Sequence, residues 1–410
     1  MSTAPTAAAE RHAHIDVLRG FALFGILLVN LLEMNSPKLF HSAFSVPRTL
    51  GLLDQGIEWF FQLFVYGKFV IIFSFLFGLG FHLFMSRAEQ KVQRVRWLFA
   101  RRLLGLALFA VLHFVFLWYG DILHTYVLAG LLLLLFYGRK TKTILIWALS
   151  LLGLWTLAMG GALLVPAEQM ARQQVANEAA FAQAVPVALD VYHNGSYVDW
   201  FQHHLRVELP TVLVTEPIFV MVALMLFLFG IYVGRTGVLE KIQAHRALIK
   251  RVWLISLAAA IPLLAVHLLI LSRTIDLGVH HALLRNQFPF VTGLALSPFY
   301  MTSVLLLMMT RVGQNWLSPL RFMGQMALTN YISMTVVAVS CVFLFDLYGR
   351  MSLLQGVLFS AALYALLAVG SYLWLQRFRF GPLEWVWRCL TYGRLQPMRK
   401  TEAVGARMAG

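Results

Sequence analysis

The sequence predicts an all-α integral membrane protein, and three observations carry that prediction. The 410 residues are 60% hydrophobic and only 12% charged, whereas soluble chains are about 45–50% apolar and about 25% charged. The mean hydropathy is +0.74. About ten segments come close to the roughly 20 apolar residues that cross the hydrocarbon core of a bilayer. We therefore expect a polytopic helical bundle of about ten transmembrane helices.

The predicted spans are joined by short connections, apart from the mixed, polar stretch 165–210. That stretch forms an outer loop for which we expect amphipathic helices, and residues 50–64 have the same character. The spans are 18–34, 67–86, 99–118, 121–137, 142–164, 211–233, 250–271, 288–310, 321–345 and 353–376. The chain thus divides into an N-terminal tail (1–17), the bundle (18–376) and a C-terminal interfacial segment with a tail (377–410).

The distribution of Lys and Arg orients this bundle. Most of the 33 basic residues fall in the tails and in every second connection, on the side of the N-terminus, as the positive-inside rule requires of cytoplasmic segments. Both termini are therefore predicted to be cytoplasmic. The net charge of +15 reports this topology and predicts no nucleic-acid partner. The first span is expected to stay uncleaved, because "EMNSPK" follows it instead of a small-residue cleavage site.

Polar residues share one face of the first span. Asp16 and Arg19 are three residues apart, and Asn30 follows Arg19 by eleven steps of 100°, which returns to nearly the same side. Such a stripe faces the bundle or a wet cavity. The structural alternative is that Arg19 pairs with Asp16 at the membrane interface and that Asn30 forms a hydrogen bond to another helix.

Histidines and a carboxylate meet at the boundary of two spans in "HFVFLWYGDILHTYVLAG", residues 113–130. Trp118, Tyr119 and Gly120 break the helix, so Asp121 either caps the next helix at His124 or lies beside His113 as part of a general base.

Other candidates carry similar alternatives. Lys68 begins a span and either anchors it or binds substrate. Asn330 and Tyr331 lie about 13 Å from Arg321 along a helix, where they either join helices or line a site. His41 stands in the first outer loop. The remaining histidines and the two distant cysteines lack the spacing of ligands, so no metal site is predicted.

Five stretches together resemble a known family: "DVLRGFALFGILLVN", "GKFVIIFSFLFGLG", "GDILHTYVLAG", "GQMALTNYISM" and "GPLEWVWRCLTYG". They are similar to the domain-of-unknown-function 418 family, the YeiB-like bacterial membrane proteins, and the resemblance runs from about residue 12 to 395. More distantly, the chain resembles the transmembrane acyltransferase superfamily, which includes the acyltransferase-3 and heparan-glucosaminide acetyltransferase proteins.

This resemblance implies an enzyme of the bacterial plasma (inner) membrane that moves an acyl group from cytoplasmic acyl-CoA, its donor substrate, to an envelope glycan or lipid acceptor. Asn30 stands where the heparan enzyme carries Asn and acyltransferase-3 members carry His, and His41 has a place comparable to the heparan enzyme's catalytic His. The residues expected to act are, for catalysis, His41, His113, Asp121 and Asn30; for substrate binding, Lys68, Asn330, Tyr331 and His124; and for the CoA phosphates, Arg19, Arg101, Arg102 and Arg321.

A transporter or flippase of a small or lipid-linked molecule is the alternative function, and a non-catalytic scaffold is a third. An enzyme should have a cavity that opens to the cytoplasm, with Arg at its mouth and His at its end. A transporter should have internal pseudo-symmetry and access from both sides. Self-association into a homo-oligomer stays open.

Overall fold

The computed structural model describes residues 13–46, 50–90 and 93–400, and its elements are helices. In chain order they are α1 (Ala13–Met34), α2 (Lys38–Ala43), α3 (Leu52–Phe64), α4 (Lys68–Glu89), α5 (Val95–Phe116), α6 (Leu123–Leu133), η2 (Leu134–Phe136), α7 (Thr141–Ala162), α8 (Ala167–Asn194), α9 (Tyr197–His203), η3 (His204–Glu208), α10 (Leu209–Leu213), α11 (Glu216–Arg235), α12 (Arg246–Leu271), η4 (Gly278–His280), α13 (His281–Met308), α14 (Arg311–Gln325), α15 (Ala327–Leu344), α16 (Leu353–Arg377) and α17 (Pro382–Tyr392).

The predicted all-α, multi-pass bundle of about ten spans is confirmed. Nine helical segments of the described chain are long and apolar enough to cross a membrane, and Leu123–Phe136 is a shorter apolar helix. One predicted span is wrong at its start. Residues 321–325 do not continue into 327–344 but end α14, a separate helix, because the backbone leaves helical geometry at Met326.

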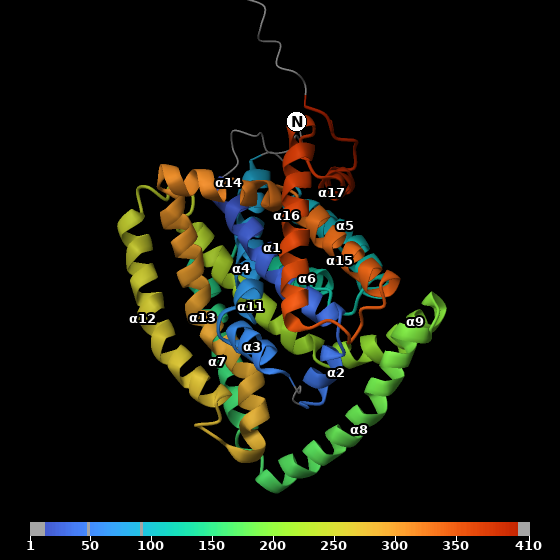
Figure 1. The fold of residues 1–410 in the computed structure, drawn as a ribbon. Coiled ribbons are helices and arrows are strands. Elements are labelled where there is room, and N and C mark those ends of the chain that lie inside the picture. Colours follow the sequence, from blue (N-terminus) through green and yellow to red (C-terminus); the bar gives the residue numbers. More distant parts are fainter. Residues whose placement is uncertain (1–12, 47–49, 91–92, 401–410) are drawn as a thin grey trace, which may run out of the picture.

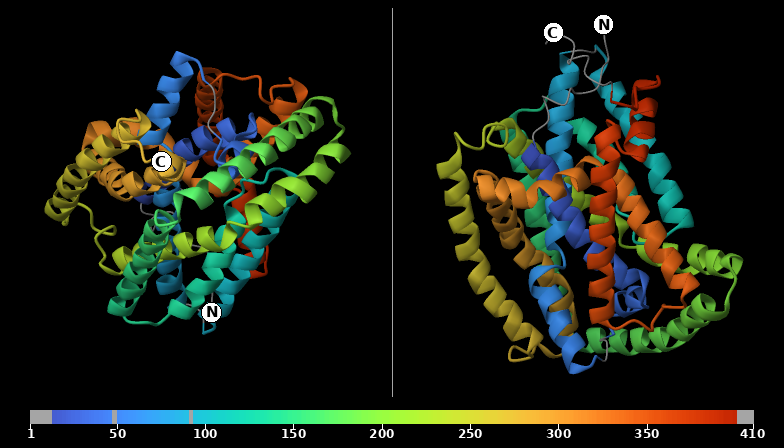
Figure 2. Two further views of the ribbon diagram at one scale, coloured as in Figure 1. Left: turned by 90° about the horizontal axis from the view of Figure 1, so that it is seen from below. Right: turned by 45° about the horizontal axis from the view of Figure 1, so that its top comes forward.

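The two ends of the bundle carry different helices (Figures 1 and 2). Helices α14 and α17 lie at one end, which we call the α17 end, and it corresponds to the side that the basic residues predict to be cytoplasmic. Helices α8 and α9 lie across the opposite end, which we call the α8 end. The polar stretch 165–210 is thus helical, as expected, and its 28-residue helix α8 covers this end of the molecule.

Glycines bring the backbones of neighbouring helices into contact and so fix the centre of the bundle. A Cβ on Gly20 of α1 would lie 2.0 Å from the carbonyl oxygen of Leu320 in α14, and a Cβ on Gly324 of α14 would lie 1.8 Å from that of Asp16. Only glycine permits so close an approach between helices, as small residues do in membrane bundles generally. Helix α1 is therefore clamped against α14 at the α17 end.

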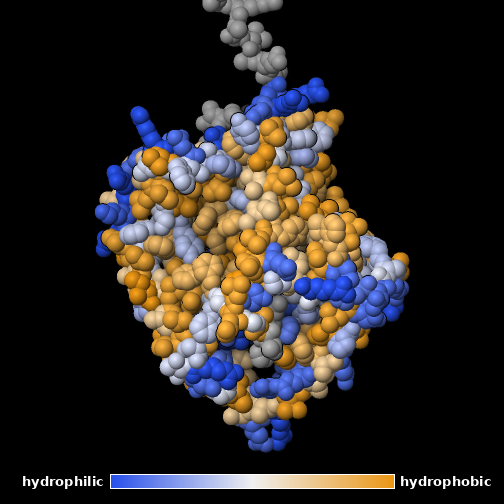
Figure 3. Space-filling model, in the orientation of Figure 1, coloured by the Kyte–Doolittle hydropathy of each residue, from blue (hydrophilic) through white to orange (hydrophobic). Residues whose placement is uncertain are grey.

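The surface matches a protein that lies in lipid. Hydrophobic residues cover most of the middle of the face in Figure 3, while hydrophilic residues gather toward its top and bottom and in a cluster at its right edge. Large apolar side chains point outward from the peripheral helices α7, α12 and α16, among them Leu157, Ile261 and Leu366, each at least 60% exposed. Such side chains are stable outward only where lipid replaces water.

Candidate functional site

The site is built around the corner between α5 and α6. His113 lies in the last turn of α5, Asp121 lies in the connection, and His124 lies in the first turn of α6. Trp118 folds back over the connection, and a Cβ on Gly120 would lie 2.2 Å from its indole. Glycine at this position therefore lets the chain turn tightly enough to bring the two histidines to the same carboxylate.

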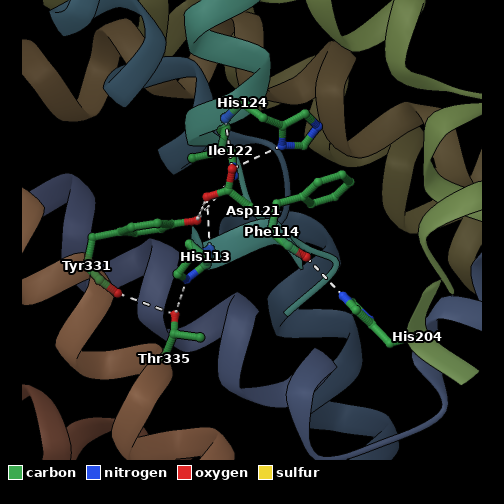
Figure 4. Close-up of polar contacts among 8 residues, drawn as sticks. All are labelled: His113, Phe114, Asp121, Ile122, His124, His204, Tyr331 and Thr335. Atoms are coloured by element: carbon green, nitrogen blue, oxygen red, sulfur yellow. Dashed lines mark hydrogen bonds and ion pairs between the residues drawn. The ribbon is translucent and has the colours of Figure 1, made fainter. Parts of the chain in front are cut away.

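Asp121 is the centre of a buried polar network (Figure 4). Its Oδ1 lies 2.9 Å from Nδ1 of His113, and its Oδ2 lies 3.0 Å from Nδ1 of His124 and accepts the backbone N–H of His124 at 2.8 Å. The side chains of His113 and Asp121 are both 0% exposed. A buried carboxylate is stable only when such partners replace water, so the two imidazoles are bound tightly to this position.

Helix α15 closes the network with two residues one turn apart. The Tyr331 hydroxyl accepts the backbone N–H of Ile122 at 3.1 Å and lies 3.4 Å from Oδ1 of Asp121. The Thr335 hydroxyl lies 2.9 Å from Nε2 of His113. His113 thus lies between a carboxylate on one ring nitrogen and a hydroxyl on the other, which is the arrangement of a general base with its orienting acid.

Helix α11 contributes a second carboxylate. Oε2 of Glu216, in the first turn of α11, lies 3.0 Å from Nε2 of His124. The His113–Asp121 and His124–Glu216 contacts are at ion-pair distance but lack the alignment of a hydrogen bond, and Oε1 of Glu216 is buried without a hydrogen-bond partner. The network therefore contains two carboxylates and two imidazoles, joined in one chain from Glu216 to His113.

A cavity of about 210 Å³ leads from the α17 end to this network. Arg19 of α1, Arg102 of α5 and Arg388 of α17 line it where these helices meet, and Tyr331 lines it on the side of Asp121. Its wall between them is aromatic and aliphatic: Phe73, Leu76, Phe77, Phe81, Phe99, Leu106, Leu123 and Tyr126. Of the residues of the network, Tyr331 lines the cavity, and its ring packs 5.0 Å from that of His113.

The arginines of the cavity are held by stacking. The guanidinium of Arg102 lies 3.7 Å from the centre of the Trp387 ring, and that of Arg388 lies 4.4 Å from the Phe380 ring. Arg19 pairs with Asp16 at 3.1 Å, as the shared face of the first span predicted. Three cations and one carboxylate, that of Glu384, thus line one cavity beside apolar walls, and the excess of positive charge favours anionic ligands.

Four of the predicted site residues share the network, namely His113, Asp121, His124 and Tyr331, and two of the predicted arginines, Arg19 and Arg102, line the cavity. Other predicted residues lie elsewhere. Lys68 is fully buried and donates to the carbonyls of Gln62 and Pro289. Asn330 donates to the Met323 carbonyl and to the Ser371 hydroxyl. Asn330 joins helices, as its structural alternative predicted. Lys68 also joins helices, but from a fully buried position and not as an anchor at the membrane boundary.

The remaining candidates also lie outside the network. His41 of α2 packs against Phe181 of α8, with Nδ1 2.9 Å from the carbonyl of Val46. Asn30 is half-buried on α1. Arg101 donates to the Leu390 carbonyl of α17, and Arg321 is exposed on α14.

Sequence reasoning missed Glu216, Thr335 and Arg388 as site residues. A carboxylate at the start of an apolar helix was the available signal for Glu216. Glu384 of α17 accepts the N–H groups of Leu328 and Thr329 at the start of α15, and burial raises the pKa of its carboxyl.

A second buried pair lies directly beside the corner. His204 of the π-helical turn η3 has Nε2 2.9 Å from the carbonyl of Phe114 and Nδ1 2.7 Å from Glu208, and both side chains are 0% exposed. Within the described residues, no group of three or more His, Cys, Asp and Glu side chains is arranged to hold a metal ion.

Comparison with known proteins gives the family. A family model described as "Protein of unknown function (DUF418)" matches residues 233–394. "Uncharacterized protein YxaH" of Bacillus subtilis is 33% identical, over 98% of this chain and all of its own. An uncharacterized protein of Bacillus acidopullulyticus is 32% identical over 96% of this chain and 97% of its own, and "Uncharacterized protein YeiB" of Escherichia coli is 25% identical over 93% and 96%. No solved structure matches. The chain, a multi-pass helical bundle throughout its described length, belongs to the DUF418 family of YeiB-like proteins.

Proposed function

We propose that this protein is a membrane acyltransferase, which takes an acyl group from acyl-CoA at the α17 end and transfers it to an envelope glycan or lipid. The observation that carries the proposal is the cavity. It has three arginines at the α17 end, and at its other end Tyr331, which contacts both Asp121 and the ring of His113. Cations for a phosphorylated donor and a base for an acceptor are the two requirements of the reaction.

The donor is assigned to the arginines. Phosphate groups bind best to guanidinium, and Arg19, Arg102 and Arg388 lie together at the α17 end. A cavity of about 210 Å³ is smaller than the roughly 300–1,000 Å³ of pockets that enclose a drug-sized ligand. It therefore admits the thioester end of acyl-CoA, while the nucleotide stays near the arginines.

The base is assigned to His113. In the transfer, a hydroxyl or amine of the acceptor attacks the thioester carbonyl, the new acyl bond forms, and the carbon–sulfur bond breaks. His113 takes the proton of the acceptor and returns it to the leaving CoA thiolate, and Asp121 orients the ring and stabilises the imidazolium. The acceptor must displace Thr335 from Nε2 of His113, and Tyr331 must turn aside to admit the thioester.

Transport of a small or lipid-linked molecule is the competing proposal, in which the same cavity is part of a path. The barrier beyond Tyr331 would then open toward the α8 end in turn. The two proposals differ in one chemical outcome, because only the enzyme breaks a thioester.

The test is acyl transfer by the purified full-length protein in lipid vesicles. The protein is incubated with radiolabelled acetyl-CoA and bacterial envelope extract, and both free CoA thiol and label in the extract are measured. We expect His113→Ala to abolish transfer while acetyl-CoA still binds. His41→Ala is the matched control, since His41 lies outside the network, and it should keep transfer.

The outcomes separate the proposals. Loss of transfer with His113→Ala but not with His41→Ala supports the α5–α6 corner as the active site. Binding of no acyl-CoA, tested with longer acyl chains as well, refutes the enzyme. Movement of labelled lipid-linked acceptors across the vesicle without thiol release favours transport.

A further inference from the structure

His124 occupies an unusual position between two carboxylates. Its Nδ1 lies 3.0 Å from Oδ2 of Asp121, and its Nε2 lies 3.0 Å from Oε2 of Glu216. The side chains of His124, Asp121 and Glu216 are 13%, 0% and 9% exposed, and the ring of Phe114 stacks on the imidazole at 4.1 Å. Both ring nitrogens therefore face a carboxylate oxygen with little access to water.

The protons of this arrangement can be counted. A neutral imidazole has one N–H, so one of its nitrogens would present a lone pair to a carboxylate. An imidazolium donates an N–H to Asp121 and places its positive charge 3.0 Å from Glu216, at ion-pair distance. Glu216 lies in the first turn of α11, where the helix dipole stabilises a negative charge. The dipole therefore favours a negative charge on Glu216 beside a positive charge on His124.

We propose that Glu216 keeps His124 protonated, so that His124 neutralises Asp121 and leaves His113 as a neutral base. Asp121 contacts both imidazoles, and the charge on one reduces its attraction for a proton on the other. Glu216 does not touch His113 or the cavity, so it acts as a positioning residue through His124. The role of His113 as base rests on the proposed function, whereas the charge of His124 does not.

The neighbourhood of the cluster supports this charge distribution. Helix α15 contributes the neutral hydroxyls of Tyr331 and Thr335, and η3 contributes His204, which contacts the backbone carbonyl of Phe114 and is paired with Glu208. The Thr335 hydroxyl donates to the carbonyl of Tyr331 at 3.3 Å, so a neutral His113 with its lone pair on Nε2 requires this hydroxyl to turn toward Nε2. In the part of the chain that the structure describes, no Lys or Arg forms an ion pair with Asp121 or Glu216. His124 is thus the cation available to them.

The first test measures the charge of His124 directly. Full-length protein with ¹⁵N-labelled histidine is reconstituted in lipid, and the ring nitrogen signals are recorded at pH 7.5, with His124 assigned from the signal that His124→Gln lacks. We expect imidazolium signals in the wild type and in Glu216→Asp, and a neutral ring in Glu216→Gln.

The matched control is Glu208→Gln, which also removes a buried carboxylate bound to a histidine, on a neighbouring element. It should leave His124 protonated. A neutral His124 in the wild type, or an imidazolium that persists in Glu216→Gln, overturns the proposal whether or not the protein transfers acyl groups.

The second test uses the pH dependence of acyl transfer. When His124 loses its charge, Asp121 attracts a proton to His113 more strongly, so the base is available only at higher pH. The acid limb of the rate profile of Glu216→Gln should move upward by on the order of one pH unit, while Glu208→Gln keeps the wild-type profile. If the acid limb of Glu216→Gln does not move although its His124 is neutral, the proposed effect on His113 is wrong. The acyltransferase proposal is unaffected by that result.

Discussion

Replacement of Asp121 is the change that most sharply separates stability from catalysis in this site. The carboxylate serves Nδ1 of His113, Nδ1 and the backbone N–H of His124, and the hydroxyl of Tyr331. In Asp121→Ala all four lose their acceptor inside the protein. In Asp121→Asn one oxygen remains, and it can accept the hydrogen bonds from both Nδ1 and the backbone N–H of His124.

The cost of each variant follows from this count. A buried donor left without an acceptor costs about 1–3 kcal/mol. Tyr331 can turn its hydroxyl away, so the three remaining groups should lower the unfolding free energy of Asp121→Ala by roughly 3–9 kcal/mol. In Asp121→Asn the amide faces His113, which can respond by placing its proton on Nε2, toward Thr335. This change of tautomer limits the loss of unfolding free energy in Asp121→Asn to about 1–2 kcal/mol. It also puts the proton on the nitrogen that acts as base in the proposed mechanism, and the same change of tautomer in a Ser-His-Asp triad costs about 10⁴-fold in rate.

The assay pairs unfolding with activity. The unfolding free energy is measured by denaturation in mixed detergent micelles, and transfer by release of CoA thiol. We expect Asp121→Asn to be nearly as stable as the wild type but to lose at least about 10³-fold in rate, and Asp121→Ala to be severely destabilised. Equal destabilisation by the two variants, or an active Asp121→Asn, would refute the reasoning.

Three further predictions concern the scaffold. Gly324→Ala should lower the unfolding midpoint strongly because its Cβ meets the backbone of α1, whereas Gly370→Ala, with nothing within 4 Å, should not; equal midpoints would contradict the close contact. Because burial raises the pKa of Glu384, its contribution to stability is full below its ordinary value of 4.5 and is lost as the pH rises; thermal midpoints from pH 4 to 8 should show this loss in the wild type and not in Glu384→Gln. The hydrogen bond from His193 of α8 lowers the pKa of Asp346 below 3.8. The contact between His193 and Asp346, which holds α8, is therefore lost as the pH falls through that lowered pKa. Pepsin should then cleave α8 of the wild type and of Asp346→Asn equally, whereas at pH 5 acid-protease cleavage should be faster in the variant.

The fold could be predicted largely from the sequence because hydropathy reports the bilayer directly. Spans of about 20 apolar residues appear without knowledge of their neighbours. The start of the predicted span 321–345 was wrong because the break at Met326 depends on α14 lying against α1 at Gly324. That contact is formed in space and leaves no local signal in hydropathy.

The site could be predicted only where its members are close in the chain. His113, Asp121 and His124 lie on one corner, so their proximity followed from local geometry. Asn330 and Tyr331 formed one polar group in the sequence, but neighbours on a helix point about 100° apart. The structure accordingly sends Asn330 to Ser371 and Tyr331 to Asp121. Partners from distant helices depend on rotations of those helices that one sequence does not specify.

The bond between His204 and the Phe114 carbonyl has a consequence for how the protein can diversify. It fastens the outer helical layer to the residue next to His113, so a molecule arriving from the α8 side meets that layer before it meets His113. If the proposed function holds, substitutions along α8–α10 change which acceptor passes, while the network of His113, Asp121 and His124 stays the same. In the proposed enzyme, the chemical step and the selection of the acceptor therefore depend on different segments of the chain.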